Sequence, residues 1–445
     1  MDAVTLARIQ FAMSVGFHYL FPTMTFGLTL LVVIFESMYV KTSNEKYKNL
    51  SNYLIKMLAL VFVLGVSTGI TLEFSFGTNW SEYSRIVGDV FGSLLAIEAL
   101  SSFFLESVFI AVLLFARNKV SKKFYLLSTF LVFFASHMSG FWILAANSFM
   151  QTPAGYESTV VAGRETLIMT DFWSVVFNHS TVIRFLHSIV SGWIAGSLMI
   201  LGISAWYIYK NKFVDLAKTL FKVSMIIFAV MSILQLFIGH FHSVQVGKTQ
   251  PAKMAAFEGL WETQKGAPLA MFGFPDEEKE ETHVEIGIPR MLSMFLFFDM
   301  DAEVQGLKDF PKEDRPPVFM SFWSYHVMIG LGMFFIALGL AHLFFYWRKT
   351  IWDKKWLLLL TMVAIPLPHV ATQTGWMAAE IGRQPWIIYG VLRTSEGASI
   401  TVGATEIWIS LIMLALIYSL LFLVFMVVLF KIIRKGPESV KLEGY

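Results

Sequence analysis

Six ionisable side chains lie within or at the edges of the long apolar runs of this chain. They are His18, Glu98, Glu106, His187, His326 and Glu380. A charge at bilayer depth costs at least about 2.5–3.5 kcal/mol, so such residues are rare and usually functional. Their grouping toward one side of the membrane predicts a buried cofactor site with a proton supply.

Two of these runs contain side chains that could ligate haem iron. His187 opens one apolar run and Met328 opens another at a similar depth, and a His/Met pair is a known ligand set for electron-transfer haem. The alternative is a packing methionine and a histidine bonded to a neighbouring carbonyl. The chain has no cysteine, which excludes iron–sulfur clusters, thiolate copper sites and c-type haem attachment.

Glu98 and Glu106 lie on one apolar run, eight residues apart. In a regular α-helix they would point about 80° apart, close enough to share a polar seam. Buried carboxylates of this kind suit a proton relay. The alternative is a structural salt bridge, but no Lys or Arg lies at matching depth. His18, on the first run, is either an iron ligand or an interfacial histidine with its hydrogen bonds satisfied.

The elements that must position these side chains are membrane spans. The 445 residues are 56% hydrophobic and 15% charged, against roughly 25% charged in soluble domains. The net charge of +2 is too small to indicate nucleic-acid binding. Windows of about 20 apolar residues predict an all-α, polytopic membrane protein with about nine spans. They cover residues 11–37, 54–76, 93–115, 124–146, 183–207, 219–240, 318–347, 356–377 and 404–430.

The distribution of Lys and Arg predicts the orientation of these spans. Alternate short loops are rich in basic residues, which places them in the cytoplasm, with the N-terminus outside and the C-terminus inside. The chain then divides into spans one to six (1–240), a long outer loop (241–317) and spans seven to nine with a cytoplasmic tail (318–445). The outer loop is proline-rich and carries an acidic stretch at residues 276–281.

The sharpest motif is Gly-Arg-Gln-Pro-Trp at residues 382–386, preceded by Gly375, Trp376 and Glu380. With this motif the chain resembles subunit I of the cytochrome bd-type quinol oxidases. Further similarity covers residues 69–80, 142–147 and 202–206 and the surroundings of Glu98 and Glu106, and so extends over nearly the whole chain.

The resemblance implies two haems b, one low-spin and one high-spin, and one haem d. His187 and Met328 would ligate the low-spin haem b, while His18 and Glu380 would ligate the other two haems in an order left open. Trp376 resembles the aromatic side chain between haems, and Arg383 resembles the motif arginine that pairs with a propionate. The residues that resemble the cytoplasmic proton route are Glu98, Glu106, Ser107 and Ser139.

The outer loop resembles the family's quinol-oxidising loop in its short form, and Lys253 and Glu258 match its quinol-site residues. The alternative for these two is an exposed amphipathic helix with ordinary charges. The sequence departs from the family at His326, two residues before Met328, where an arginine is common. Because residues i and i+2 lie on roughly opposite faces of a helix, His326 is expected to meet a propionate or another polar group rather than the same iron.

The implied enzyme oxidises ubiquinol or menaquinol outside and reduces O2 to water. It takes chemical protons from the cytoplasm, and so generates a proton motive force without pumping. The resemblance also implies a polytopic subunit II, a small single-span subunit, surrounding lipid, and a bacterial or archaeal cytoplasmic membrane. Two other hypotheses stay open: an ion-coupled transporter or channel that uses the buried carboxylates, and a divergent haem protein without quinol or oxygen chemistry.

Overall fold

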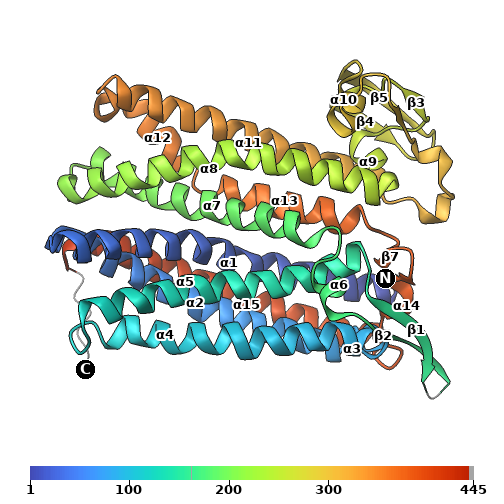
Figure 1. The fold of residues 1–445 in the computed structure, drawn as a ribbon, viewed down its shortest axis with the longest axis horizontal. Coiled ribbons are helices and arrows are strands. Elements are labelled where there is room, and N and C mark those ends of the chain that lie inside the picture. Colours follow the sequence, from blue (N-terminus) through green and yellow to red (C-terminus); the bar gives the residue numbers. More distant parts are fainter. Residues whose placement is uncertain (162, 440–445) are drawn as a thin grey trace.

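Nine helices long and apolar enough to cross a membrane occur in the computed structural model, which describes residues 1–161 and 163–439. They run side by side along one direction (Figure 1), and the prediction of a mostly helical, nine-span protein is confirmed. The spans are α1 (Ala3–Thr42), α2 (Glu45–Gly77), α3 with α4 (Ser81–Glu98 and Phe104–Phe115), α5 (Lys122–Gln151), α7 (Thr181–Tyr209), α8 (Val214–Thr249), α11 (Val318–Trp347), α12 with α13 (Lys355–Val363 and Leu367–Ile381) and α15 (Ala404–Lys435).

Most of these helices extend past the apolar windows that predicted them. The sixth span was expected to end at residue 240, but α8 continues to Thr249, and α5 continues past residue 146 to Gln151. Backbone hydrogen bonds continue a helix into the polar boundary of the membrane, where hydrophobicity no longer marks it. These extra turns carry polar side chains of the functional site.

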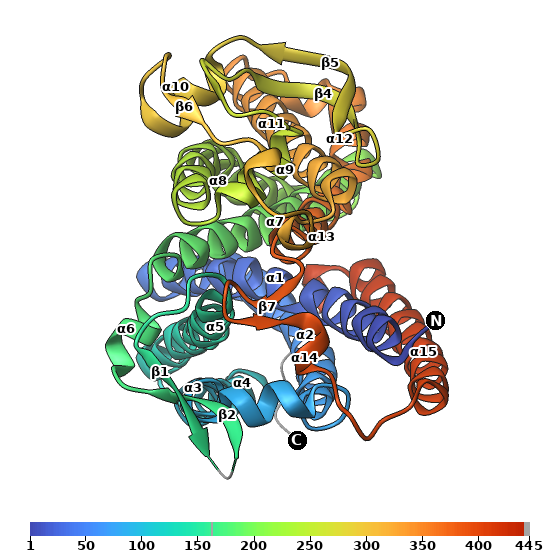
Figure 2. The ribbon, with the colours of Figure 1, turned by 90° about the vertical axis from the view of Figure 1, so that its right-hand side faces the viewer.

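The spans form two groups, seen end-on in Figure 2. Helices α1, α2, α3–α4 and α5 form one group, α7, α8, α11 and α12–α13 form the other, and α15 packs beside α1 and α2. The groups meet where α1 crosses α7 at Gly27 and Gly196. A Cβ atom added to Gly27 would lie 2.5 Å from the Gly196 Cα atom, so glycine is needed for this close crossing.

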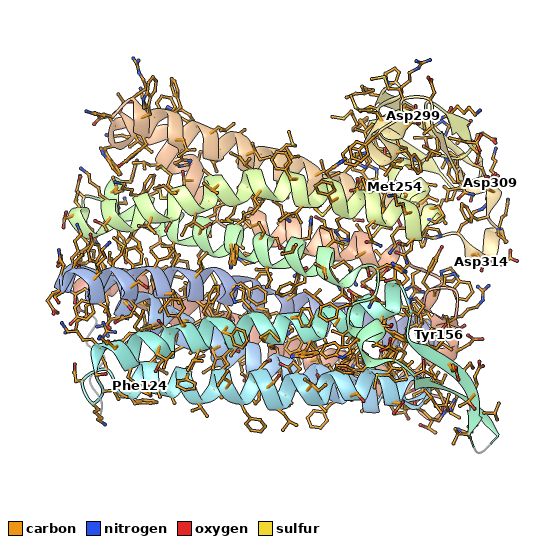
Figure 3. All side chains as sticks on the ribbon, in the orientation of Figure 1. Phe124, Tyr156, Met254, Asp299, Asp309 and Asp314 are labelled. Atoms are coloured by element: carbon orange, nitrogen blue, oxygen red, sulfur yellow. The ribbon has the colours of Figure 1, made fainter. Side chains whose placement is uncertain are left out.

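The shorter elements lie mostly at the end of the bundle that also holds the N-terminus, whereas α15 ends at the opposite end (Figure 1). In Figure 3, Met254, Asp299, Asp309 and Asp314 lie at the first end and Phe124 at the other. The short α-helices are α6 (Phe172–Val176), α9 (Pro251–Glu258), α10 (Met291–Phe297) and α14 (Thr394–Gly397). Four antiparallel pairs of strands accompany them: β1–β2 (Tyr156–Val161 and Arg164–Met169), β3–β6 (Gln264–Lys265 and Glu303–Val304), β4–β5 (Leu269–Asp276 and Glu281–Ile288) and β7–β8 (Trp386–Ile388 and Leu392–Arg393).

The segment after α8 is therefore a folded unit rather than an irregular loop. The acidic stretch forms the turn of the β4–β5 hairpin, where Glu280 pairs with Arg315 at 3.0 Å and Lys312 at 2.7 Å. Arg393, from the connection between α13 and α15, pairs with Asp314 at 2.5 Å. The Glu280 pairs hold the hairpin against the rest of this segment, and the Asp314–Arg393 pair joins the segment to the connection after α13. Residues 250–317 are called the outer segment after their predicted orientation.

Candidate functional site

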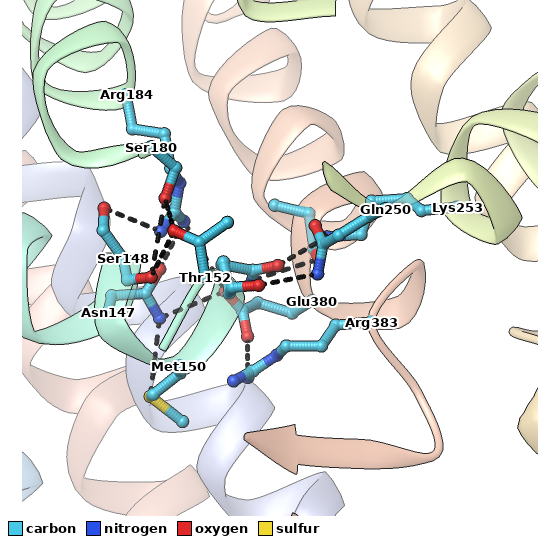
Figure 4. Close-up of polar contacts among 12 residues, drawn as sticks. Asn147, Ser148, Met150, Thr152, Ser180, Arg184, Gln250, Lys253, Glu380 and Arg383 are labelled. Carbon is cyan, nitrogen blue, oxygen red and sulfur yellow. Dashed lines mark hydrogen bonds and ion pairs between the residues drawn. The ribbon is translucent and has the colours of Figure 1, made fainter. Parts of the chain in front are cut away.

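A polar network surrounds Glu380 at the end of α13 (Figure 4). Its carboxylate accepts hydrogen bonds from Asn147 at 3.1 Å and Gln151 at 3.2 Å, both on α5. Arg383 forms a direct ion pair with it, and the Arg184 guanidinium lies 3.9 Å away. Two buried cations and two amides therefore surround this carboxylate.

Arg383 retains hydrogen-bonding capacity beyond this pair. Its side chain is buried and also donates to the Ile387 carbonyl, but its Nε–H has no partner. Buried guanidinium hydrogens are normally satisfied. The unsatisfied donor suits a further acceptor such as a haem propionate.

Lys253 brings the outer segment into the same network. Its Nζ donates to Gln151 at 2.5 Å and to Gln250 at 2.6 Å. Burial holds the pKa of Lys253 well below its ordinary value, although attraction to Glu380 opposes the shift. A Cβ atom added to Gly382 would lie 2.8 Å from the Lys253 Cγ atom. The glycine of the 382–386 motif therefore allows α9 to pack against the end of α13.

Glu258 lies on another side of α9, because five residues rotate a helix by about 140°. Its Oε2 accepts from the Ala270 N–H at 2.8 Å, while its buried Oε1 has no partner. Burial raises the pKa of Glu258 to about 8. Lys253 and Glu258 are each 3% exposed, so α9 is not the exposed amphipathic helix of the alternative interpretation. The structure does not bring the two side chains together.

His18 lies against α2, and the hydrogen bonds of Thr68 favour one tautomer of its ring. The Thr68 hydroxyl gives its hydrogen to the Leu64 carbonyl at 2.7 Å, so it acts as acceptor toward His18 Nδ1 at 2.9 Å. With the hydrogen on Nδ1, the His18 Nε2 lone pair is free for a metal, the arrangement usual for ligating histidines.

His187 and Met328 also have surroundings that fit a cofactor. The buried His187 Nδ1 has no partner, which excludes at this atom the alternative of a bond to a neighbouring carbonyl. Glycines face three of the four candidate ligands: added Cβ atoms at Gly69 and Gly239 would lie 3.2 and 3.6 Å from the imidazole Cε1 atoms of His18 and His187, and one at Gly375 would lie 2.7 Å from Met328 Sδ. Glycine at 375 therefore lets Met328 pack closely on α13, and the unpaired His187 Nδ1 leaves a buried atom that suits a further partner.

The other two residues predicted around the haems lie on α11 and α13. Trp376 is partly buried on α13, one turn before Glu380. His326 stands on α11 and contacts two backbone carbonyls, those of Phe322 at 2.9 Å and Ala270 at 3.0 Å. The polar partners of His326 in the structure are thus backbone groups of its own helix and of the outer segment.

The helix with Glu98 and Glu106 differs from the prediction in one respect. A π turn, Ala99–Phe103, separates α3 from α4. Its extra residue shifts the register by about 100°, so the two carboxylates point within about 20° of each other rather than 80° apart. Sequence periodicity assumes a regular helix and could not show this alignment.

The hydrogen bonds of this region distinguish the two serines. Ser139 donates to Glu98 at 2.6 Å, whereas Ser107 donates to the Phe103 carbonyl of its own helix at 2.8 Å. The buried Glu106 has an Oε1 atom without a partner. Among the described residues, no Lys or Arg forms an ion pair with Glu98 or Glu106.

Some residues of the site were not singled out from the sequence. Gln151 and Gln250 hold Lys253, Glu73 lies within electrostatic reach of Glu98, and the His242 ring lies 5.1 Å from that of His187. Glu73 could have been found as an ionisable residue near the end of an apolar run. The glutamines carry no such signal, because their role depends on helix ends beyond the apolar windows.

These features define a polytopic membrane protein with buried polar groups between its helices, several of them without a partner among the described residues. The profile of the family Cytochrome bd terminal oxidase subunit I matches residues 6–437, and the chain belongs to this family. It is therefore one subunit of a multi-subunit, haem-containing oxidase, with a second subunit as partner.

Relatives agree with this assignment over their whole length. The chain is 38% identical to cytochrome bd ubiquinol oxidase subunit 1 of Bacillus subtilis (strain 168), covering 98% of this chain and 95% of that protein. It is 32% identical to cytochrome bd-II ubiquinol oxidase subunit 1 of Escherichia coli (strain K12), covering 99% and 98%. The structure of bd oxidase from Geobacillus thermodenitrificans superposes with a TM-score of 0.91 at 26% identity, covering 98% of this chain and 99% of that one.

Proposed function

We propose that this chain oxidises membrane quinol at its outer end and passes the electrons to O2 within the membrane. The observation that carries the proposal is Glu258, a buried carboxyl group of the outer segment with one oxygen fixed and the other free. Relatives named ubiquinol oxidase support the substrate class. A relative in Bacillus subtilis, 29% identical over 98% of both chains, is named a putative menaquinol oxidase subunit, so the quinone type stays open.

The cofactors proposed are two haems b and one haem d. His187 and Met328 would hold the low-spin haem b, and His18 and Glu380 the other two haems. When bound, the haems supply electron transfer and the reduction of O2. Arg383 would bind a propionate through its free Nε–H, and Trp376 would separate two of the rings.

Glu258 is the proposed proton acceptor for quinol. Deprotonated, its free Oε1 can accept a hydrogen bond from a quinol hydroxyl and then the proton, while Ala270 keeps Oε2 in place. Lys253 is proposed as a second quinol contact, and it would exchange one of its two glutamine partners for a quinol oxygen. Because the two side chains lie on different sides of α9, they would contact the quinol from different directions.

Protons for oxygen reduction are proposed to arrive from the cytoplasm through Glu106 and Glu98, with Ser139 and Ser107 beside them. The alignment produced by the π turn supports this route, since both carboxylates then lie along one line of the helix. Quinol protons leave outside. Consumption inside and release outside generate a membrane potential without a pumping cycle.

The proposed setting is a bacterial cytoplasmic membrane, with the N-terminus and the outer segment outside and the C-terminal end of α15 in the cytoplasm. The basic loops at that end support this orientation. Subunit II is proposed to be polytopic, and a small single-span subunit and surrounding lipid are proposed to complete the complex.

The test is Glu258→Gln in the purified complex with subunit II, beside Glu262→Gln as control. Glu262 belongs to the same segment, but its exposed carboxylate pairs with Lys308. We expect quinol:O2 activity to fall about 10²–10⁴-fold in Glu258→Gln only, with haem reduction by dithionite unchanged. In the wild type, kcat/KM for quinol should rise with pH through about 8 as Glu258 loses its proton, and this rise should vanish in the variant. Unchanged activity and pH profile would contradict the proposal.

A further inference from the structure

The backbone of Ala270, on strand β4, is held from two sides. Its N–H donates to Glu258 Oε2 at 2.8 Å, and its carbonyl oxygen lies 3.0 Å from His326 Nε2. Ala270 is itself buried. One residue of the outer segment therefore connects Glu258 on α9 with His326 on α11.

The position of the His326 ring is fixed within its own helix. The ring stacks on Phe322 with centroids 3.9 Å apart and planes 20° apart, and Nδ1 lies 2.9 Å from the Phe322 carbonyl oxygen. Phe322 is fully buried. The ring cannot swing away without losing this stacking. Both ring nitrogens face carbonyl oxygens, and a neutral imidazole carries one hydrogen, so the proposal takes the tautomer with that hydrogen on Nε2, directed at the strand.

Strand β4 is irregular next to Ala270, where its pairing with β5 is interrupted. The pairing of β4 with β5 shifts register between Ala270 and Phe272, and such irregularities interrupt the ladder and change the direction of the strand. The peptide that holds Glu258 thus lies at the edge of a weakened pairing, where a donor from α11 can fix it.

We propose that His326 is a positioning residue for Glu258, acting through Ala270. By fixing the Ala270 peptide, it keeps the free Glu258 Oε1 directed toward quinol without touching the quinol itself. It also ties the quinol-oxidising segment to α11, the helix that carries Met328. This inference rests on the proposed role of Glu258 in quinol oxidation.

The test compares His326→Phe, which keeps the stacking and removes the donor, with His326→Gln, which keeps an N–H donor near the Ala270 carbonyl. We expect His326→Phe to lower kcat/KM for quinol about 3- to 10-fold, the value of one hydrogen bond of up to about 1.5 kcal/mol, and His326→Gln to recover most of it. The control is Trp323→Phe. Trp323 packs on Phe272 and Phe274 of the same strand, but its Nε1 bonds to nothing described.

A double-mutant cycle shows whether His326 acts through Glu258. In a Glu258→Gln background, His326→Phe should have no further effect on the residual kcat/KM, because the group it positions is gone. Reduced-minus-oxidised spectra of the low-spin haem should match the wild type in His326→Phe, since Met328 lies on another face of α11.

The outcomes separate the two proposals. Full quinol activity in Glu258→Gln overturns the proposed function. If Glu258→Gln loses activity, two results overturn only the positioning role. One is that His326→Phe lowers kcat/KM by the same factor in the Glu258→Gln background as in the wild type, and the other is that His326→Phe has no effect in the wild type. An altered low-spin haem spectrum in His326→Phe would also overturn it, by showing that His326 acts on the haem.

Discussion

Two groups of buried carboxylates in this chain have opposite environments. Glu380 is surrounded by Arg383, Arg184 and two amide donors, with Lys253 close by. Glu98 has one serine donor and Glu106 has an oxygen without a partner, and neither has an ion pair within the described residues. A compensated carboxylate keeps its charge and its place, whereas an uncompensated one exchanges protons readily. The comparison supports the proposal of ligation and anchoring for the first group and of proton transfer for the second.

The largest effect is expected at Glu380. Glu380→Gln leaves two buried guanidinium groups without a counter-charge, and removing one partner of a buried pair costs about 3–5 kcal/mol. It also removes a proposed iron ligand. We expect haem content per protein to fall, O2 consumption to approach background, and the complex to unfold at a lower temperature.

Glu406→Gln is the control for this change, because Glu406 is an exposed carboxylate of α15 toward the same end of the bundle. Haem content and activity should stay at wild-type levels there. A Glu380→Gln complex with full haem content and unchanged unfolding temperature would show that the surrounding cations do not depend on this carboxylate.

A smaller loss of activity, without loss of stability, is expected for Glu106→Gln. The amide keeps the shape of the side chain but cannot carry a proton, so O2 consumption should fall about 10²–10⁴-fold. Because no ion pair is broken, haem content and unfolding temperature should not decrease. The unfolding temperature should thus fall in Glu380→Gln but not in Glu106→Gln, and this difference separates the two groups of carboxylates.

Ser101→Ala is the control, because among the described residues the Ser101 hydroxyl on the adjacent π turn bonds to the Ile97 carbonyl and to Ser102 of its own helix. Its activity should match the wild type. Should Glu106→Gln lose haem to the same degree as Glu380→Gln, Glu106 would be a structural support of the cofactor site rather than a proton carrier.

The sequence predicted most of the helices and the identities of the chemical groups, but not their immediate partners. Hydrophobicity located the nine spans because a membrane imposes length and composition on each of them. It missed the polar ends of α5 and α8, and with them Gln151 and Gln250, because helical hydrogen bonds continue where hydrophobicity stops. The π turn between Glu98 and Glu106 is a backbone event that periodicity cannot show, and the bond from His326 to Ala270 depends on how a distant strand packs.

The smallest effects should distinguish the two serines of the proposed proton route. Ser139 donates its hydrogen to Glu98, so Ser139→Ala removes the only hydrogen bond described for that carboxylate and should slow O2 consumption about 3- to 10-fold at saturating quinol. Ser107 gives its hydrogen to the Phe103 carbonyl, and Ser107→Ala should change the rate less than about twofold, since no carboxylate loses a partner. An equal or larger effect of Ser107→Ala would place its hydroxyl on the route. Proton transfer would then depend on a rotation of that side chain away from the Phe103 carbonyl, and the group that carries protons would include Ser107 on α4 beside the two carboxylates.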